Sequence, residues 1–170
     1  MSEHTLLDGK KILIVDDEAD ILDILEELLE MCEVVKASTF EEAKGLLESE
    51  HFDMAILDIM GVNGYGLLEI ANKKDVPAVM LTAHAFTPGN LLRSVKEGAD
   101  SYLPKEEMGN IAIFLNDIFE AIEKGKDPWG PWQKKLPESY FEKRWGAMSR
   151  DKNQDFWNQF RTSIKERKNK

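Results

Sequence analysis

Carboxylates follow two short apolar runs in this sequence. Lys11–Val15 leads into Asp16, Asp17 and Glu18, and residues 54–57 lead into Asp58. Runs of about five residues with both faces apolar fit strands buried on both sides of a parallel sheet, although a buried helix segment would show the same pattern. In open parallel sheets ligands bind beyond the carboxyl ends of the strands, so these acids are expected to share one crevice. Their mutual repulsion would have to be offset by a cation or a bound proton.

Two further apolar runs end in groups that could hold a phosphate. Thr82 closes the run 78–82, and Lys105 follows the run 101–103. Mg²⁺ prefers oxygen ligands and keeps several waters, so one or two carboxylates and a phosphate satisfy it. Phosphoryl transfer needs little beyond a nucleophile, a metal and a cation that holds an oxygen. This set of groups predicts phosphoryl transfer to Asp58, with an acyl phosphate as product.

Strands and helices that alternate along the chain would bring these residues together at one edge of a sheet. Strands are expected at 11–15, 34–37, 54–58, 78–82 and 101–103, and helices at 20–30, 40–48, 67–74, 90–96 and 111–123. Ser38 or Thr39 can cap the second helix, and Gly98 is expected as the left-handed residue that ends the fourth. Such alternation indicates an α/β fold with right-handed crossovers and a parallel sheet covered on both faces.

Four segments carry a resemblance to a known family. They are residues 14–18 (IVDDE), 55–60 (AILDIM), 80–83 (MLTA) and 98–105 (GADSYLPK). Any one is weak evidence, but together, in order and spacing, they make residues 11 to about 124 resemble the receiver domain of two-component response regulators. The resemblance implies a flavodoxin-like (βα)5 doubly wound parallel sheet of order 2-1-3-4-5.

The resemblance also implies a metal site and a phosphoryl donor. Asp58 would accept a phosphoryl group from a sensor histidine kinase or a phosphotransfer protein. Mg²⁺ would be the cofactor, bound directly by Asp17, largely through water by Asp16, and further by Asp58 and the backbone carbonyl of Met60. The protein would be a signalling protein and not an enzyme, beyond catalysing its own phosphorylation and dephosphorylation.

Further roles follow from the same resemblance. Thr82 would hydrogen-bond the phosphoryl group and Lys105 would pair with it. Thr82 and Tyr102 would form the conformational switch. Met60 and His84 stand at two variable positions beside the site and would tune the lifetime of the phosphorylated form.

The sequence departs from the family pattern at two prolines. Gly61 and Val62 stand where the family usually has a proline soon after the acceptor, and Glu106 stands where proline usually follows the lysine. The loop after Asp58 is therefore less constrained. A cis bond after Lys105 would cost about 3 kcal/mol without proline, so that geometry stays open at this point.

Two other functions were weighed against phosphoryl acceptance. A receiver-like interaction module that works without phosphorylation usually lacks the acids or the lysine, and all are present here. An aspartate-nucleophile phosphatase needs a second acid two residues after the nucleophile, where this chain has Met60.

Charge divides the chain into two parts. Residues 1–125 hold 26 acidic and 10 basic residues, a net charge of −16, and residues 126–170 hold 6 and 12, a net of +6. We expect a receiver at 8–125 and a basic, Trp-rich extension at 126–170 with helices at 138–148 and 154–167, packed on the receiver or on a partner. Residues 124–131, rich in Gly and Pro, are expected to begin an irregular segment.

The composition also excludes some partners. No run reaches the roughly 18 apolar residues of a membrane helix and no signal peptide is recognised, which predicts a cytoplasmic protein without membrane contact. An acidic receiver repels phosphate backbones and the extension shows no recognition helix, so sequence-specific DNA binding is not expected. A homodimer is left open. Cys32 is the only cysteine and is expected to be buried filler.

Overall fold

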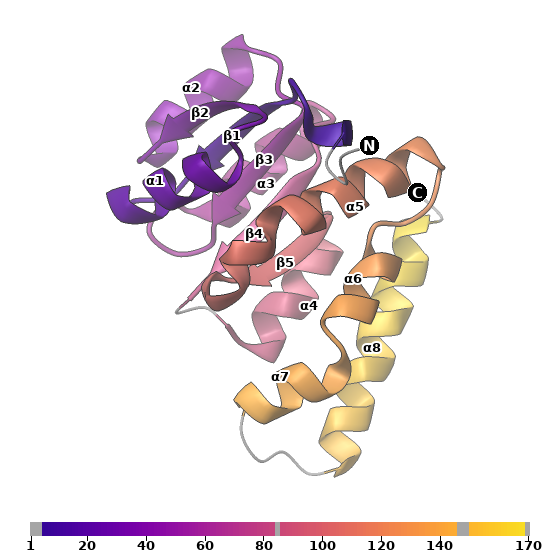
Figure 1. Ribbon diagram of the computed structural model, residues 1–170. Coiled ribbons are helices and arrows are strands. Elements are labelled where there is room, and N and C mark those ends of the chain that lie inside the picture. The colour runs from indigo at the N-terminus through magenta and orange to yellow at the C-terminus, as the bar shows by residue number, and fades with distance from the viewer. Residues whose placement is uncertain (1–4, 84–85, 146–149, 169–170) are drawn as a thin grey trace.

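The computed structural model describes residues 5–83, 86–145 and 150–168. Five strands alternate with five helices, and further helices follow toward the C-terminus (Figure 1). The strands are β1 (Lys11–Val15), β2 (Glu33–Ala37), β3 (Met54–Asp58), β4 (Ala78–Thr82) and β5 (Ser101–Pro104). The helices between and after them are α1 (Ala19–Leu28), α2 (Phe40–Ser49), α3 (Gly64–Lys73), α4 (Pro88–Lys96) and α5 (Ile111–Glu123). Short 3-10 helices cover Thr5–Leu7 (η1) and Lys105–Asn110 (η2).

The five strands form one parallel sheet of order β2-β1-β3-β4-β5. This confirms the predicted flavodoxin-like order 2-1-3-4-5. Every residue of β3 and β4 is buried, as expected for strands covered on both faces. Helices α1 and α5 contact each other on one face, and α2 and α3 contact each other on the other (Figure 1).

Local sequence signals set the helix starts. The Thr39 side chain accepts a hydrogen bond from the Glu42 amide at the start of α2, and Thr87 does the same for the Asn90 amide in α4. Helix α3 begins three residues earlier than predicted, because Asn63 adopts a left-handed conformation (φ 53°) and its side chain caps Gly66. Gly98, at φ 98°, follows α4 as predicted.

The described part of the C-terminal extension is mostly helical. It contains α6 (Trp129–Lys135), α7 (Glu138–Trp145) and α8 (Arg150–Lys168). The predicted irregular segment is confirmed for residues 124–128 but ends there, because α6 begins at Trp129. Pro131 is tolerated there since it lies in the first turn, where a backbone N–H has no helical partner. Part of the predicted helix 138–148 lies outside the described residues.

The extension packs along the β5 side of the sheet. Helix α8 contacts α4, and α6 contacts α5 (Figure 1). One continuous cluster of buried apolar side chains joins the sheet to the extension; its members from the extension include Trp129, Trp132, Phe141, Trp157 and Phe160. Forty-odd residues with few aliphatic side chains make a poor core alone, so burial against the receiver is what orders these helices.

None of the helices in the described part of the chain is long and apolar enough to cross a membrane. Cys32 is half-buried, its thiol donates to the carbonyl of Leu7, and burial raises the pKa of the thiol to about 11. This agrees with the expected role as filler.

Candidate functional site

A lysine joins the acids of two strand ends. The Lys105 Nζ lies 2.9 Å from Asp16 Oδ2, 3.5 Å from Asp58 Oδ1 and 3.8 Å from Glu18 Oε1. Strand register explains the meeting, because Val15 pairs with Leu57, Asp58 with Leu81 and Thr82 with Pro104. The carboxyl ends of the strands therefore lie level, and the residues that follow them converge.

The site is buried and its charges are unbalanced. Asp58 is 5% exposed and Asp16 is fully buried. Burial, followed by repulsion from Asp16 and Asp17, raises the pKa of Asp58 to about 6, although Lys105 acts against the rise. Burial also raises the pKa of Asp16, opposed by its hydrogen bond with Lys105. A positive ion beside these carboxylates would relieve this repulsion.

Burial alone would lower the pKa of Lys105, but its contacts with Asp16, Asp58 and Glu18 outweigh burial and raise it. The lysine is therefore charged at neutral pH. It is placed to hold an anionic oxygen next to Asp58.

The acids at the end of β1 fit a divalent cation. Carboxylate oxygens of Asp16, Asp17 and Glu18 all lie within 4.8 Å of one another. A side chain at position 61 would collide with this cradle, since a Cβ on Gly61 would lie 2.5 Å from Asp17 Oδ1. Gly61 also has a φ of 45°, which favours glycine. These oxygen donors match the preference of Mg²⁺, which when bound would neutralise charge on a phosphoryl group.

The loop after Asp58 is held against the strand end. A Cβ on Gly64 would lie 2.3 Å from the Asp58 carbonyl oxygen, so glycine is what lets the start of α3 approach so closely. Met60 is 55% exposed, and its carbonyl accepts a hydrogen bond from the Val62 amide. The role of that carbonyl as a metal ligand stays a prediction.

The remaining predicted residues are placed as follows. Thr82 is buried at the end of β4, next to the strand that carries Asp58. Tyr102 is fully buried in β5, and burial raises the pKa of its phenol. Among the described residues no peptide bond is cis, and this includes the bond after Lys105. His84 lies outside the described residues, so its tuning role stays a prediction.

Two residues near the site were not predicted to matter, and a third, Glu18, was expected among the acids of the crevice but was given no separate role. Glu18 joins both the acid cluster and the contacts of Lys105, and its adjacency to Asp17 was a signal for that role. Glu106 lies shortly after β5 and Phe86 shortly after β4, and both residues contact the extension. Those contacts depend on residues more than thirty positions away, so no local signal could reveal them.

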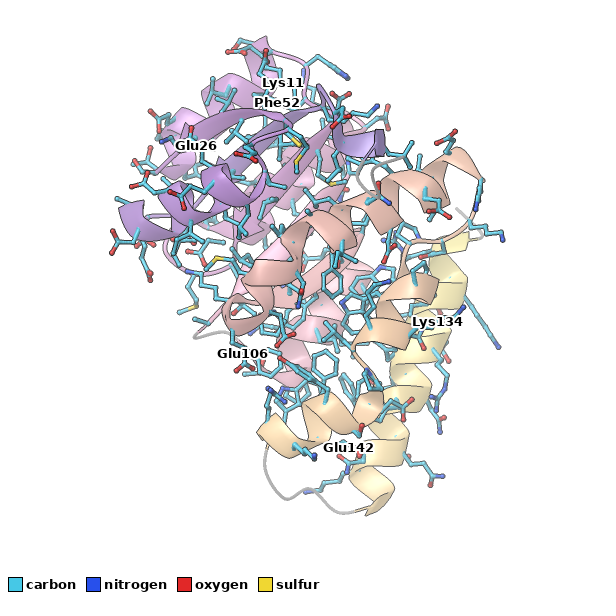
Figure 2. All side chains as sticks on the ribbon, in the orientation of Figure 1. Lys11, Glu26, Phe52, Glu106, Lys134 and Glu142 are labelled. Carbon is cyan, nitrogen blue, oxygen red and sulfur yellow. The ribbon has the colours of Figure 1, made fainter. Side chains whose placement is uncertain are left out.

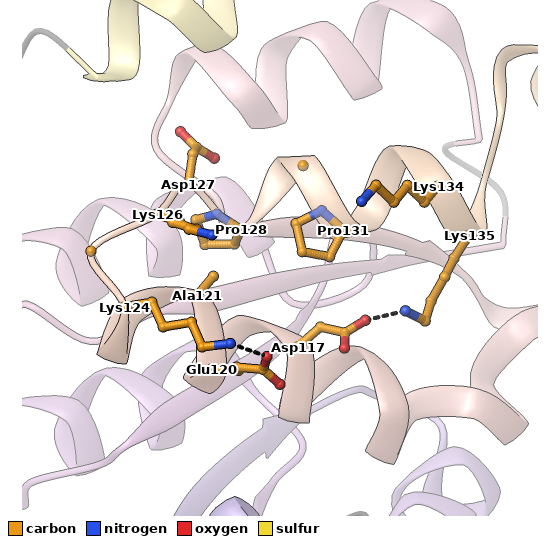
Figure 3. A pocket seen from close by; sticks show the side chains of 12 residues that line it. Asp117, Glu120, Ala121, Lys124, Lys126, Asp127, Pro128, Pro131, Lys134 and Lys135 are labelled. Atoms are coloured by element: carbon orange, nitrogen blue, oxygen red, sulfur yellow. Dashed lines mark hydrogen bonds and ion pairs between the residues drawn. The ribbon is translucent and has the colours of Figure 1, made fainter.

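One cavity adjoins this site, and a larger one lies away from it. A cavity of about 280 Å³ adjoins it and is lined by Thr82, Ala83, Phe86, Pro104, Lys105 and Glu106. A larger one, about 980 Å³, lies between the end of α5 and α6, away from the acids. Ion pairs at 2.7 Å (Lys124 with Glu120) and 2.5 Å (Lys135 with Asp117) line it (Figure 3). Of these two cavities, the smaller one is the one that adjoins Lys105 and Thr82.

Comparison with known proteins gives a consistent family. The model of the response regulator receiver domain matches residues 12–113, more than half of the chain. The chain is 46% identical over 122 residues to the probable transcriptional regulator ycf27 of Guillardia theta, a match that covers 66% of this chain and 48% of that protein. It is 34% identical over 129 residues to the protein of the same name from Porphyridium aerugineum, covering 70% and 53%.

A solved structure shows the same fold. The response regulator receiver domain protein (CheY-like) from Methanospirillum hungatei JF-1 superposes with a TM-score of 0.63 at 30% identity, covering 69% of this chain and 99% of that one. The chain belongs to the response regulator receiver domain family of two-component systems. Response regulators are signalling proteins. The chain spans about half the length of the curated relatives it matches.

Proposed function

We propose that this chain is a phosphoryl-accepting response regulator that takes its phosphoryl group on Asp58 with the help of Mg²⁺. A carboxylate oxygen of Asp58 forms the new bond to phosphorus as the bond from phosphorus to the donor's leaving group breaks. The leaving group departs with the electron pair of that bond. The donor is a sensor histidine kinase or a phosphotransfer protein, in keeping with the family.

The contact of Lys105 with both Asp16 and Asp58 carries this proposal. It places a charged ammonium group 3.5 Å from the acceptor oxygen, beside a cluster of carboxylates that suits a divalent cation. Asp16, Asp17 and Asp58, with the Met60 carbonyl, would hold Mg²⁺. Glu18 belongs to the same acid cluster and could help. Thr82 and Lys105 would hold the phosphoryl oxygens, and preorganised donors of this kind are what phosphoryl transfer needs.

The switch and tuning assignments are part of the same proposal. Thr82 and Tyr102 would change position with phosphorylation, and Met60 and His84 would set how long the phosphoryl group survives. We place the receiver at residues 8–125 and the extension at 126–170.

The names of the relatives do not by themselves support a DNA-binding role for this chain. Two relatives are named as probable transcriptional regulators, but the matches cover about half of those proteins. The matched part is the acidic receiver, which would repel DNA. We therefore propose output through protein contacts, with self-association of the chain left to measurement.

Acetyl phosphate with Mg²⁺ tests the assignment by intact mass. The wild-type chain should gain the mass of one phosphoryl group, and Asp58→Asn should gain none. Asp23→Asn, a change to an exposed acid of α1, is the matched control and should label like wild type. An unlabelled wild-type chain would favour the phosphorylation-independent interaction module, and label persisting in Asp58→Asn would place the acceptor elsewhere.

A further inference from the structure

Two of the regions in which the extension contacts the receiver differ in their distance from Asp58 along the sheet. The first region lies at the start of β5. The Trp129 indole donates to the Ala99 carbonyl at 3.0 Å, and Arg167 donates to the same carbonyl at 2.7 Å and to Asp100 at 3.0 Å. The start of a parallel strand is the edge of the sheet opposite to Asp58. These contacts fix the start of α6 and the end of α8 at the edge of the sheet away from the phosphoryl site.

The second region lies beside the phosphoryl site and holds α7. Glu106 Oε1 accepts hydrogen bonds from the Tyr140 hydroxyl at 2.9 Å and from Arg144 Nε at 2.5 Å. The Phe86 ring stacks on Phe141, with centroids 5.5 Å apart, and its centroid lies 6.0 Å from that of Trp145. Figure 2 shows Glu106 where the receiver meets α7.

Glu106 and Phe86, which hold α7, both follow site residues closely in the sequence. Glu106 directly follows Lys105, and Phe86 lies four residues after Thr82. The cavity of about 280 Å³ between them is lined by all four of these residues. A movement of Lys105 or Thr82 toward a group on Asp58 would therefore pull on the nearby contacts that hold α7.

The two regions also differ in how firmly they hold. The side chains of Arg167 and Asp100 are 16% and 17% exposed, so breaking their pair would leave a buried charge without a partner. The side chains of Arg144 and Glu106 are 34% and 54% exposed, and solvent weakens such pairs. Of the two ion pairs, the one between α7 and the receiver is thus the less costly to break.

We propose that α7 is the output element of this chain, and that phosphorylation of Asp58 weakens its docking while α6 and α8 stay in place. The inference rests on the proposed function. Lys105 is now shared between Asp16 and Asp58, and a phosphoryl group would draw it, together with Thr82, toward Asp58. Glu106 and Phe86 would move with them, away from Tyr140 and Phe141. The released face of α7 would then be open to a partner protein.

Hydrogen exchange on the full chain tests this inference. Exchange is followed by mass in the peptides covering α6, α7 and α8, with acetyl phosphate and Mg²⁺ and without them, and the intact mass of the same sample reports phosphorylation. The coupling usual between linked sites predicts exchange in α7 that is about fivefold faster or more after phosphorylation, with α6 and α8 unchanged.

The outcomes separate this inference from the proposed function. A fully labelled chain in which α7 exchanges as before overturns the inference alone. The same holds if α6 and α8 loosen together with α7. A chain that takes no phosphoryl group on Asp58 overturns both.

Two arginine variants show whether the receiver contact carries the effect. Arg144→Gln breaks the pair between α7 and Glu106, whereas Arg161→Gln breaks a pair of similar exposure between α8 and Glu138 of α7. Arg144→Gln should speed exchange in α7 before phosphorylation and shrink the further change that phosphorylation causes. Arg161→Gln should leave that phosphorylation-dependent change in place. Equal loss of the change in both variants would overturn the inference.

Discussion

Replacing Asp58 with Asn should stabilise the metal-free chain at neutral pH. The carboxylate is buried beside Asp16 and Asp17, which raises its pKa from 3.8 to about 6. Each pKa unit corresponds to 1.36 kcal/mol, so ionising Asp58 costs the folded state about 3 kcal/mol at pH 7. Asn occupies the same space without the charge. The free energy of unfolding of Asp58→Asn should therefore exceed that of wild type by about 3 kcal/mol.

The pH dependence has a definite sign. The folded state binds the Asp58 proton more tightly than the unfolded state does, so the stability from this group is fully present below about pH 4 and is lost as the pH rises past about 6. The advantage of Asp58→Asn should shrink to about 1 kcal/mol near pH 4.5. Asp16 also has a raised pKa, but it is present in both proteins, and their difference isolates Asp58.

Urea unfolding in the presence of a chelator, at pH 7 and pH 4.5, measures both quantities. Asp23→Asn on the exposed face of α1 is the control and should stay within about 0.5 kcal/mol of wild type. Added Mg²⁺ should stabilise wild type more than Asp58→Asn, because Asp58 is one of the proposed ligands that would bind it in the folded state. A variant no more stable than wild type at pH 7, or a difference that does not shrink at pH 4.5, would refute the reasoning.

Three other measurements test the metal site and the extension. Asp17→Ala should weaken Mg²⁺ binding in a titration more than Asp16→Ala does, and equal or reversed losses would count against direct ligation by Asp17. Trp132→Phe should cost about 1–3 kcal/mol in urea unfolding, since it leaves the buried Tyr102 carbonyl without its indole donor; Trp145→Phe should cost less, because its buried indole nitrogen has no hydrogen-bond partner. Every tryptophan lies in the extension, so tryptophan fluorescence reports whether the extension is docked. The emission of the intact chain should be blue-shifted and should redden when proteolysis releases residues 126–170; water-like emission from the intact chain would contradict this.

Local patterns in the sequence determined the sheet and its reactive edge. Short apolar runs bounded by polar residues marked all five strands, and the observed order 2-1-3-4-5 is the predicted one. Because parallel strands place their carboxyl ends at one edge, the residues after β1, β3 and β5 had to converge there. Asp16, Asp58 and Lys105 do so. The chemical roles of these residues remain predictions.

The tertiary structure alone decided how the extension is placed. Helix α6 was missed, because glycine and proline around Trp129 indicate a break, and the helix is ordered by burying Trp129 and Trp132 against β5. The contact of Glu106 with Arg144 joins residues 38 positions apart. Apolar periodicity reports which face of a segment is buried, but the surface that covers it depends on distant parts of the chain. For this reason the docking of α7 beside Lys105 could be seen only in the folded molecule.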